Sequence, residues 1–427
     1  MWNLAQSVDD TAKGGLTTWN VTGESFSLPM RYQPEEYLGA GAYGVVIAAR
    51  DHATDKNVAI KKCKSVLKSK TLAKRVLREI RLLRVLNHDN IVAAHDVLIP
   101  VSSKSSTFRS LYIVLELMGT DLASVIRSDQ ELSDKHCRYF VVQLCRAVAH
   151  MHGSCVIHRD LKPRNILVNE NCTLKVADFG LARVTCTASP SGVVYMTEYV
   201  TTRWYRAPEI LLATGRYDET IDLWAVGCVL AEILGRRPIF PGTDSATQVK
   251  LICQDLGLPS RSFMKTLSDS AQELLRKHCT HAKRRDWTTL YPDANPKALS
   301  LLANLLCFDS EERVSAAEAL QADYFSCFTQ EPVNRISVPY LSEEFSFEVE
   351  GLTLGQLRDE IMLESQRHQP LPSRVEDKDE APTTSADTRE DTAVTAMTVM
   401  EDSPESNDVG GLPDHPHRHP QSHRLPQ

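Results

Sequence analysis

Two patterns of apolar residues divide the chain. Up to residue 117, β-branched and aromatic residues gather in short runs such as Leu111–Leu115, which are typical of buried strands. Further along, apolar residues mostly recur at helical spacing, as they do between Phe140 and Met151. The pattern predicts an α+β protein with two lobes: a strand-rich lobe over residues 32–117 and a mainly helical lobe over residues 118–328.

Three segments fall outside these lobes. Residues 1–31 mix Ser, Thr, Gly and other polar residues without periodicity, and we expect a flexible arm. Residues 329–368 contain an amphipathic piece in which Thr353 and Gln356 form a capping box. We expect this extension to pack on the lobes; binding to a partner is the alternative. Residues 369–427 are rich in Pro, Ser, Thr, Asp, Glu and His, which predicts a disordered tail.

Composition narrows the class of protein. The chain has 427 residues, 42% of them hydrophobic, and a net charge of −7, so it can bury a core and shows no sign of direct nucleic-acid binding. Its 11 cysteines lack the paired spacing of zinc sites, which indicates reduced thiols. The most apolar run, Leu223–Leu234, is too short to span a bilayer, and no signal peptide is visible. We therefore expect a soluble protein of the cytoplasm and nucleus without membrane partners.

A glycine-rich turn lies between two strand-like runs. Gly39, Gly41 and Gly44 lack a Cβ atom, so the backbone can lie over the phosphates of a nucleotide. Dinucleotide-binding proteins use the same spacing, but there the glycines open a helix. Because β-branched residues follow here, the pattern favours a strand and a flap over ATP. The nucleotide contacts predicted for this flap are Leu38, Gly39, Ala40, Gly41, Ala42, Tyr43, Gly44, Val45 and Val46.

Lys61 ends a buried-strand pattern, and Glu79 lies on the helix that the following apolar spacing predicts. An ion pair between the two would hold Lys61 against the phosphates of a nucleotide. The alternatives are a surface lysine and a solvated glutamate on a basic helix. The neighbouring motifs favour the ion pair.

The run Leu111–Gly119 leads from the first lobe to the second. Sequence alone shows only a buried strand. Because the run lies between Lys61 and residues 158–165, which are described next, we expect it to form part of the nucleotide-binding site. Its backbone groups could hydrogen-bond an adenine ring, and apolar side chains could line the pocket. The predicted adenine contacts are Ala59, Leu115, Glu116, Met118 and Leu167.

The chain is organised around residues 158–165, which place an acid, a lysine and an amide within one short segment. Asp160 can accept the proton of an incoming hydroxyl group, and Lys162 can offset the charge of a transferring phosphate. Asn165 and Asp178 supply the oxygen ligands that Mg²⁺ prefers. The catalytic residues predicted for phosphoryl transfer are Lys61, Asp160, Lys162, Asn165 and Asp178.

A long segment with little periodicity runs from residue 178 to residue 209 and is either a passive loop or a switch. Thr197 and Tyr199 carry two hydroxyl groups there, and phosphorylation would add about −2 charge to each. Both phosphates would need basic partners, and we expect three arginines from distant segments, Arg78, Arg159 and Arg183, to converge on the phosphate of Thr197; the alternative is a set of unrelated surface arginines. The arginines available as partners are Arg78, Arg159, Arg183, Arg203 and Arg206.

Two buried charges are expected to support the second lobe. Asp222 begins a helix that is apolar on all sides, so its carboxylate needs a partner, and we expect it to hold the backbone of residues 158–165. Arg313 is a candidate partner for Glu209.

Together these motifs resemble the eukaryotic protein kinases over roughly residues 32–330. The Thr197-Glu198-Tyr199 lip, the run Thr202–Glu209 and an insert near residues 243–285 are similar to the mitogen-activated protein kinases, and residues 168–172 resemble the big MAP kinase branch most. The resemblance implies a two-lobed fold, use of ATP and Mg²⁺, and transfer to Ser or Thr followed by Pro. It also implies activation by a MAP kinase kinase that phosphorylates the lip, and reversal by phosphatases.

The chain departs from this family at several points. Arg164 stands where the family usually has serine, and the docking segment Phe325–Asn334, usually rich in aspartate, offers only Glu331. The tail is also shorter than that of the big MAP kinases. A kinase-fold scaffold that only binds partners is the alternative function; it predicts loss of Lys61 or an essential aspartate, and none is lost.

Overall fold

The structure, a computed structural model, describes residues 4–8, 16–41, 44–100, 108–185, 202–214, 217–279, 283–329 and 336–368, the first of these by its backbone alone. Ala42, Tyr43, Thr197, Tyr199 and the tail after residue 368 lie outside this part of the chain.

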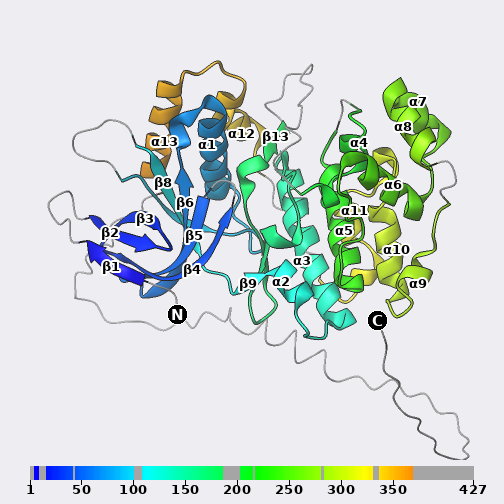
Figure 1. Cartoon of the computed structure of the whole chain (residues 1–427), viewed down its shortest axis with the longest axis horizontal. Coiled ribbons are helices and arrows are strands. Elements are labelled where there is room, and N and C mark those ends of the chain that lie inside the picture. Colours follow the sequence, from blue (N-terminus) through cyan, green and yellow to red (C-terminus); the bar gives the residue numbers. More distant parts are fainter. Residues whose placement is uncertain are drawn as a thin grey trace, which may run out of the picture. The chain divides into compact units, whose positions relative to one another are not determined.

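The first lobe is an antiparallel five-stranded sheet with one long helix against it (Figure 1). Its strand order is β4-β5-β6-β8-β7, and consecutive strands pair residue by residue, as where Ala59 of β6 faces Leu115 of β8. The elements are β4 (Tyr32–Gly41), β5 (Gly44–Asp51), β6 (Lys56–Lys64), α1 (Lys70–Val85), β7 (Ala94–Leu98) and β8 (Ser110–Glu116).

The predicted flexible arm is wrong for residues 16–29. Strands β2 (Leu16–Val21) and β3 (Glu24–Pro29) pair antiparallel, and β1 (Leu4–Val8) joins them. Phe26 and Leu28 alternate with serines along β3 and are fully buried, and the Phe26 ring lies 5.8 Å from that of Tyr112. This alternation covers too few residues to stand out among polar neighbours in the sequence. Burial of the two large side chains holds the hairpin on the sheet.

The second lobe is mainly helical and is built around α5 (Thr220–Gly235). All residues of α5 from Ile221 to Ile233 are buried, which confirms the expected central helix. The other helices are α2 (Leu122–Arg127), α3 (Asp134–Gly153), α4 (Pro208–Leu211), α6 (Ser245–Leu256), α7 (Arg261–Thr266), α8 (Asp269–Cys279), α9 (Trp287–Leu290), α10 (Pro296–Leu305) and α11 (Ala316–Leu320). No helix in the described ranges is both long and apolar enough to cross a membrane.

Short strands lie on both sides of the catalytic segment, residues 158–165, which lies between α3 and α4 in the chain. The expected hairpin is present, since β11 and β12 pair antiparallel, and β11 also pairs with β9. The strands are β9 (Thr120–Asp121), β10 (Val156–Ile157), β11 (Ile166–Val168), β12 (Leu174–Val176) and β13 (Arg183–Val184).

The extension after the second lobe returns to the first, where α13 (Leu354–Arg367) lies beside α1 (Figure 1). Leu357 and Ile361 are fully buried, and the capping box of Thr353 and Gln356 is present. The buried carboxylate of Glu364 pairs with arginines of α1. α12 (Val338–Glu344) and the short 3₁₀ helix η8 (Ser346–Glu348) precede α13. The extension therefore fixes the helix that carries Glu79.

Candidate active site

The glycine-rich turn joins two paired strands. Gly41 faces Gly44 across the β4–β5 hairpin, and β5 continues as a strand. A Cβ atom on Gly44 would lie 2.1 Å from the carbonyl oxygen of Lys62, so close strand packing requires glycine there. Gly39 and Gly41 have open space around their Cα atoms. Because the glycines open no helix, the dinucleotide-binding alternative fails.

A cavity of about 330 Å³ lies under this hairpin. Ala40, Gly41, Gly44 and Val45 line it from the strands, while residues of α1 and the second lobe close it from the other side. The polar groups that line the cavity include Arg75, Glu79 and Asp178.

Lys61 lies between two carboxylates from different lobes. Its Nζ atom is 2.5 Å from Glu79 Oε1 and 3.0 Å from Asp178 Oδ1, so the expected ion pair is present. Burial lowers the pKa of Lys61, but the charges of Asp178 and Glu79 outweigh it and hold that pKa well above its usual value. Lys61 is therefore a fixed cation that joins α1 to the second lobe.

Asp160 is held by the two residues predicted to act with it. Its Oδ2 atom accepts hydrogen bonds from Lys162 Nζ at 2.7 Å and from Asn165 Nδ2 at 3.0 Å. Asn165 Nδ2 also donates to the backbone oxygen of Asp160 at 2.8 Å. The amide nitrogen of Asn165 is thus engaged, and its side-chain oxygen remains available as a ligand.

Asp178 is the second acid of the site. Its backbone is in the left-handed region, with φ of 68°, which is strained for a residue other than glycine. The positive charge of Lys61 lowers the pKa of Asp178, although burial opposes it. The backbone nitrogen of Ala177, next to Asp178, donates to the backbone oxygen of Asn165 at 2.9 Å. A carboxylate and an amide oxygen are the kinds of ligand that suit Mg²⁺.

The catalytic segment is supported from beneath by α5. Asp222 accepts hydrogen bonds from the backbone nitrogens of His158 and Arg159 at 2.8 and 2.9 Å and lies 3.0 Å from His152 Nε2. Burial raises the pKa of Asp222, but these partners outweigh it and lower the pKa below its usual value. The predicted role of Asp222 is confirmed.

His158 itself was not predicted to have a role. Its Nε2 atom lies 3.2 Å from the carbonyl oxygen of Ala177, and its ring packs edge-on against Phe179 at 5.1 Å. It therefore joins the segment before Asp160 to the segment that carries Asp178. Its place inside the motif was the only signal in the sequence.

The residues predicted to contact adenine lie around the connection between the lobes. Ala59 and Leu115 face each other on β6 and β8, and Leu167 lies on β11. The backbone nitrogen of Glu116 donates to the carbonyl oxygen of Ala93 at 3.0 Å, so this N–H group is already bonded. Met118 is buried, whereas Leu38 on β4 is 45% exposed.

Three of the five candidate arginines converge. Arg78 Nη1 donates to the carbonyl oxygen of Gly180 at 3.5 Å and Arg159 Nη1 to that of Leu181 at 3.3 Å, just before Arg183 in the chain. Burial and the charges of Arg78 and Arg159 lower the pKa of Arg183 to about 10. Arg78 pairs through two nitrogens with the carboxylate of Glu348, at 2.8 Å for Nη2 and Oε2. Glu348 belongs to the extension, and no pattern in the sequence pointed to this contact.

The other two arginines are placed differently. Arg203 Nη1 donates to the carbonyl oxygen of Thr243 at 2.8 Å, and its binding to a phosphate of the lip stays a prediction. Arg206 is buried and lines a small cavity that Arg159 and Asp160 also line. A hydrogen bond to a fixed carbonyl explains the position of Arg203, which sequence proximity to Tyr199 could not reveal.

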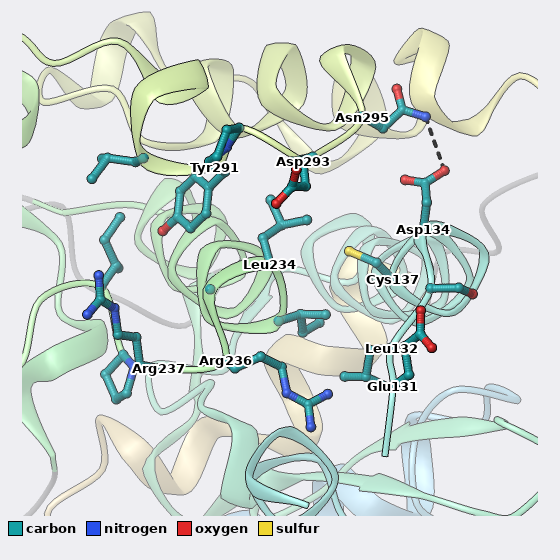
Figure 2. Close-up of a pocket in the computed structure, with 18 of the residues that line it drawn as sticks. Glu131, Leu132, Asp134, Cys137, Leu234, Arg236, Arg237, Tyr291, Asp293 and Asn295 are labelled. Carbon is teal, nitrogen blue, oxygen red and sulfur yellow. Dashed lines mark hydrogen bonds between the residues drawn. The ribbon is translucent and has the colours of Figure 1, made fainter. Parts of the chain in front are cut away.

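A larger cavity of about 970 Å³ lies elsewhere in the second lobe (Figure 2). None of the predicted catalytic residues lines it. Two of its acids are already paired: Asp134 accepts from Asn295 at 3.1 Å, and Asp255 pairs with Arg285 at 3.1 Å. Its size therefore does not make it the site of phosphoryl transfer.

Comparison with known proteins gives the family. The model of the protein kinase domain matches residues 32–325. Mitogen-activated protein kinase 5 of Arabidopsis thaliana is 43% identical over 366 residues, which are 84% of this chain and 94% of that relative. Mitogen-activated protein kinase 4 of Oryza sativa subsp. japonica is 45% identical over 310 residues, 73% of this chain and 82% of the relative.

A third relative, extracellular signal-regulated kinase 1 of Dictyostelium discoideum, is 44% identical over 305 residues, which are 71% of this chain and 57% of the relative. Similarity to the big MAP kinase branch in particular stays a prediction. Both lobes, the Lys61–Glu79 pair and the Asp160 cluster agree with the family. The chain is thus a serine/threonine protein kinase of the mitogen-activated protein kinase family.

Proposed function

We propose that the chain transfers the γ-phosphate of ATP to Ser or Thr followed by Pro in protein substrates. In this proposal an upstream MAP kinase kinase activates the enzyme by phosphorylating Thr197 and Tyr199, phosphatases reverse the activation, and the enzyme acts in the cytoplasm and nucleus. The observation that carries the proposal is the position of Lys61 between Glu79 and Asp178, next to the Asp160 cluster.

In this proposal each residue of the site has a separate role in phosphoryl transfer. Asp160 receives the proton of the acceptor hydroxyl group, and its contacts with Lys162 and Asn165 keep its carboxylate oriented. Lys162, 2.7 Å from that carboxylate, is close enough to stabilise charge on the moving phosphate. Lys61 holds the phosphates that stay behind, and Glu79 fixes Lys61.

The nucleotide and its metal fit the groups that remain. Bound Mg²⁺ would neutralise phosphate charge, and the Asn165 side-chain oxygen and the Asp178 carboxylate would hold it. The glycine hairpin would cover the phosphates with its backbone. The carbonyl group of Glu116 and the backbone of Met118 would bind the adenine edge between Ala59, Leu115 and Leu167.

The arginine cluster supports control by phosphorylation. Arg78 comes from α1, Arg159 from the catalytic segment and Arg183 from β13, so one phosphate among them would join the lobes. At present Glu348 offsets part of this positive charge through Arg78. Nothing in the described residues favours a scaffold, because Lys61, Asp160 and Asp178 are all in place.

The first test measures transfer of labelled phosphate to a Ser-Pro peptide and to the same peptide with Ser-Ala. After treatment with an active MAP kinase kinase, we expect transfer to Ser-Pro and about tenfold or more lower kcat/KM for Ser-Ala, equivalent to about 1.4 kcal/mol. Untreated enzyme is the control. Equal transfer to both peptides would refute proline direction, and no transfer by doubly phosphorylated enzyme would refute the kinase proposal.

Replacing Thr197 with Ala should cripple the treated enzyme, because the arginine cluster would lack its phosphate. Coupling energies between sites are typically 1–3 kcal/mol, so we expect activity to fall about 5- to 150-fold. Ser-Pro peptide transfer by Thr197→Ala and Thr197→Ser, each treated alike, would measure this. Full activity of the alanine variant would contradict the clamp, and the serine variant should retain most activity.

A further inference from the structure

Arg164 lies in the catalytic segment, yet none of the roles above uses it. It is the middle residue of the short 3₁₀ helix η2 (Pro163–Asn165) and immediately precedes Asn165, which contacts Asp160. Its side chain is exposed, and no residue of the described ranges forms a hydrogen bond or an ion pair with it. The catalytic segment thus carries an exposed positive charge for which the described residues show no partner.

A second exposed arginine comes from the helix that packs on η2. Helix α2 contacts η2 and ends at Arg127, whose side chain is exposed and touches only Ser124, at 3.4 Å, among the described residues. Arg236, at the end of α5, donates to the carbonyl oxygen of Ser128 and so ties α5 to the end of α2. Three positively charged side chains thus come from adjoining elements.

The positive charges of Arg127, Arg164 and Arg236 are only partly offset by acidic groups nearby. Tyr205 donates to the buried carboxylate of Glu232 at 2.6 Å. Burial raises the pKa of both groups; the charge of Arg164 opposes the rise for Tyr205, and that of Arg127 opposes it for Glu232. Arg164 and Arg127 also lie on two elements in contact, η2 and α2. Exposed Asp129 and Glu131 follow in the next loop, while Asp160 is already bound by Lys162.

An acceptor hydroxyl group must reach Asp160, so the peptide around it must pass close to η2. Arg164 lies four positions after Asp160 and its side chain is exposed there. A guanidinium group binds carboxylate and phosphate groups through paired hydrogen bonds, which serine cannot do.

We propose that Arg164, aided by Arg127, binds an anionic side chain of the protein substrate close to the phosphoacceptor. The preferred substrates would carry a carboxylate or phosphate group within three residues of the acceptor. This inference rests on the proposed transfer to Ser-Pro or Thr-Pro sites and names a narrower class of substrate for the same site.

The test uses the full-length, activated enzyme and a set of Ser-Pro peptides. A single Gln, Glu or phosphoserine is placed at each position within three residues of the acceptor, apart from the proline. We expect kcat/KM for Glu to exceed that for Gln about fivefold at one or two adjacent positions, as for an exposed charge pair. Phosphoserine, with its greater charge, should give a larger ratio, and added NaCl should lower both.

Variants test whether Arg164 causes the difference in kcat/KM between the Glu and Gln peptides. Arg164→Ser should bring the Glu-to-Gln ratio close to one, and Arg164→Glu should invert it, so that a peptide with Lys at that position becomes the better substrate. Arg127→Ser should reduce the ratio in part. The matched control is Arg276→Ser, an exposed arginine on α8, which should keep the wild-type ratio.

The outcomes separate this inference from the proposed function. If the wild type phosphorylates the Gln peptides but shows no preference for an anion at any position, the inference is wrong. It is equally wrong if Arg164→Ser keeps the preference. A preference for phosphoserine alone would support it and identify the anion as a phosphate. Failure on every Ser-Pro peptide would overturn the proposed function and this inference together.

Discussion

Replacing Asp160 with Asn should lower kcat for phosphoryl transfer by about 10²- to 10⁴-fold, the usual contribution of a positioned general base. Asparagine has nearly the same shape, and its oxygen can still accept a hydrogen bond from Lys162, which lies 2.7 Å from the present carboxylate. It cannot accept the proton of the substrate hydroxyl group. The change therefore removes the chemistry of Asp160 and keeps most of its packing.

Two measurements test this expectation. Steady-state transfer to a Ser-Pro peptide gives kcat, and displacement of a fluorescent ATP analogue gives nucleotide affinity. We expect a large fall in kcat with little change in affinity, since Lys61, Glu79 and Asp178 remain. The matched comparison is Lys61→Met, which should weaken the hold on the phosphates as well. An Asp160→Asn enzyme within tenfold of the wild type would rule out the assigned role.

Replacing Arg313 with Ala should lower the free energy of unfolding by about 3–5 kcal/mol, because it leaves a buried carboxylate unpaired. Arg313 is fully buried and contacts both oxygens of Glu209, at 2.8 and 3.1 Å, as predicted. Arg313 also donates to the carbonyl oxygens of Thr220 at 2.8 Å and Cys307 at 3.0 Å. One guanidinium group thus ties the segment after the activation lip to α5 and to the end of α10.

Urea unfolding monitored by circular dichroism measures the loss. The exposed Arg276→Ala variant should stay within about 0.5 kcal/mol of the wild type. The double variant Glu209→Leu/Arg313→Met removes both charges and should recover part of the loss, but the two backbone carbonyls would still lack their donor. An Arg313→Ala protein as stable as the control would show that the pair contributes little.

Much of the catalytic arrangement followed from sequence because it depends on residue types at short spacing. Asp160, Lys162 and Asn165 lie within six residues, so any compact turn brings them together, and the structure joins them directly. The Lys61–Glu79 pair was predictable from one strand and one helix with clear apolar periods. Similarly, a charge such as Asp222 on an otherwise apolar helix required a partner in the core.

Other features depended on which surfaces meet. The hairpin of residues 16–29 has too few apolar positions to show a period, and burial of Phe26 and Leu28 against the sheet determines it. The place of Arg203 depends on a carbonyl group 40 residues later in the chain. The contact of Arg78 with Glu348 joins residues 270 positions apart.

The sequence by itself therefore determined the class of fold, the order of the motifs, and which residues are candidates for catalysis and metal binding, since these follow from local periodicity and short spacing. Only the tertiary structure decided several other long-range contacts: the ion pair of Glu348 with Arg78, the hydrogen bond from Arg203 to the carbonyl oxygen of Thr243, and the exposed position of Arg164 on an element in contact with α2. The physical reason is that charged side chains have many possible partners in sequence, and burial and packing select one of them.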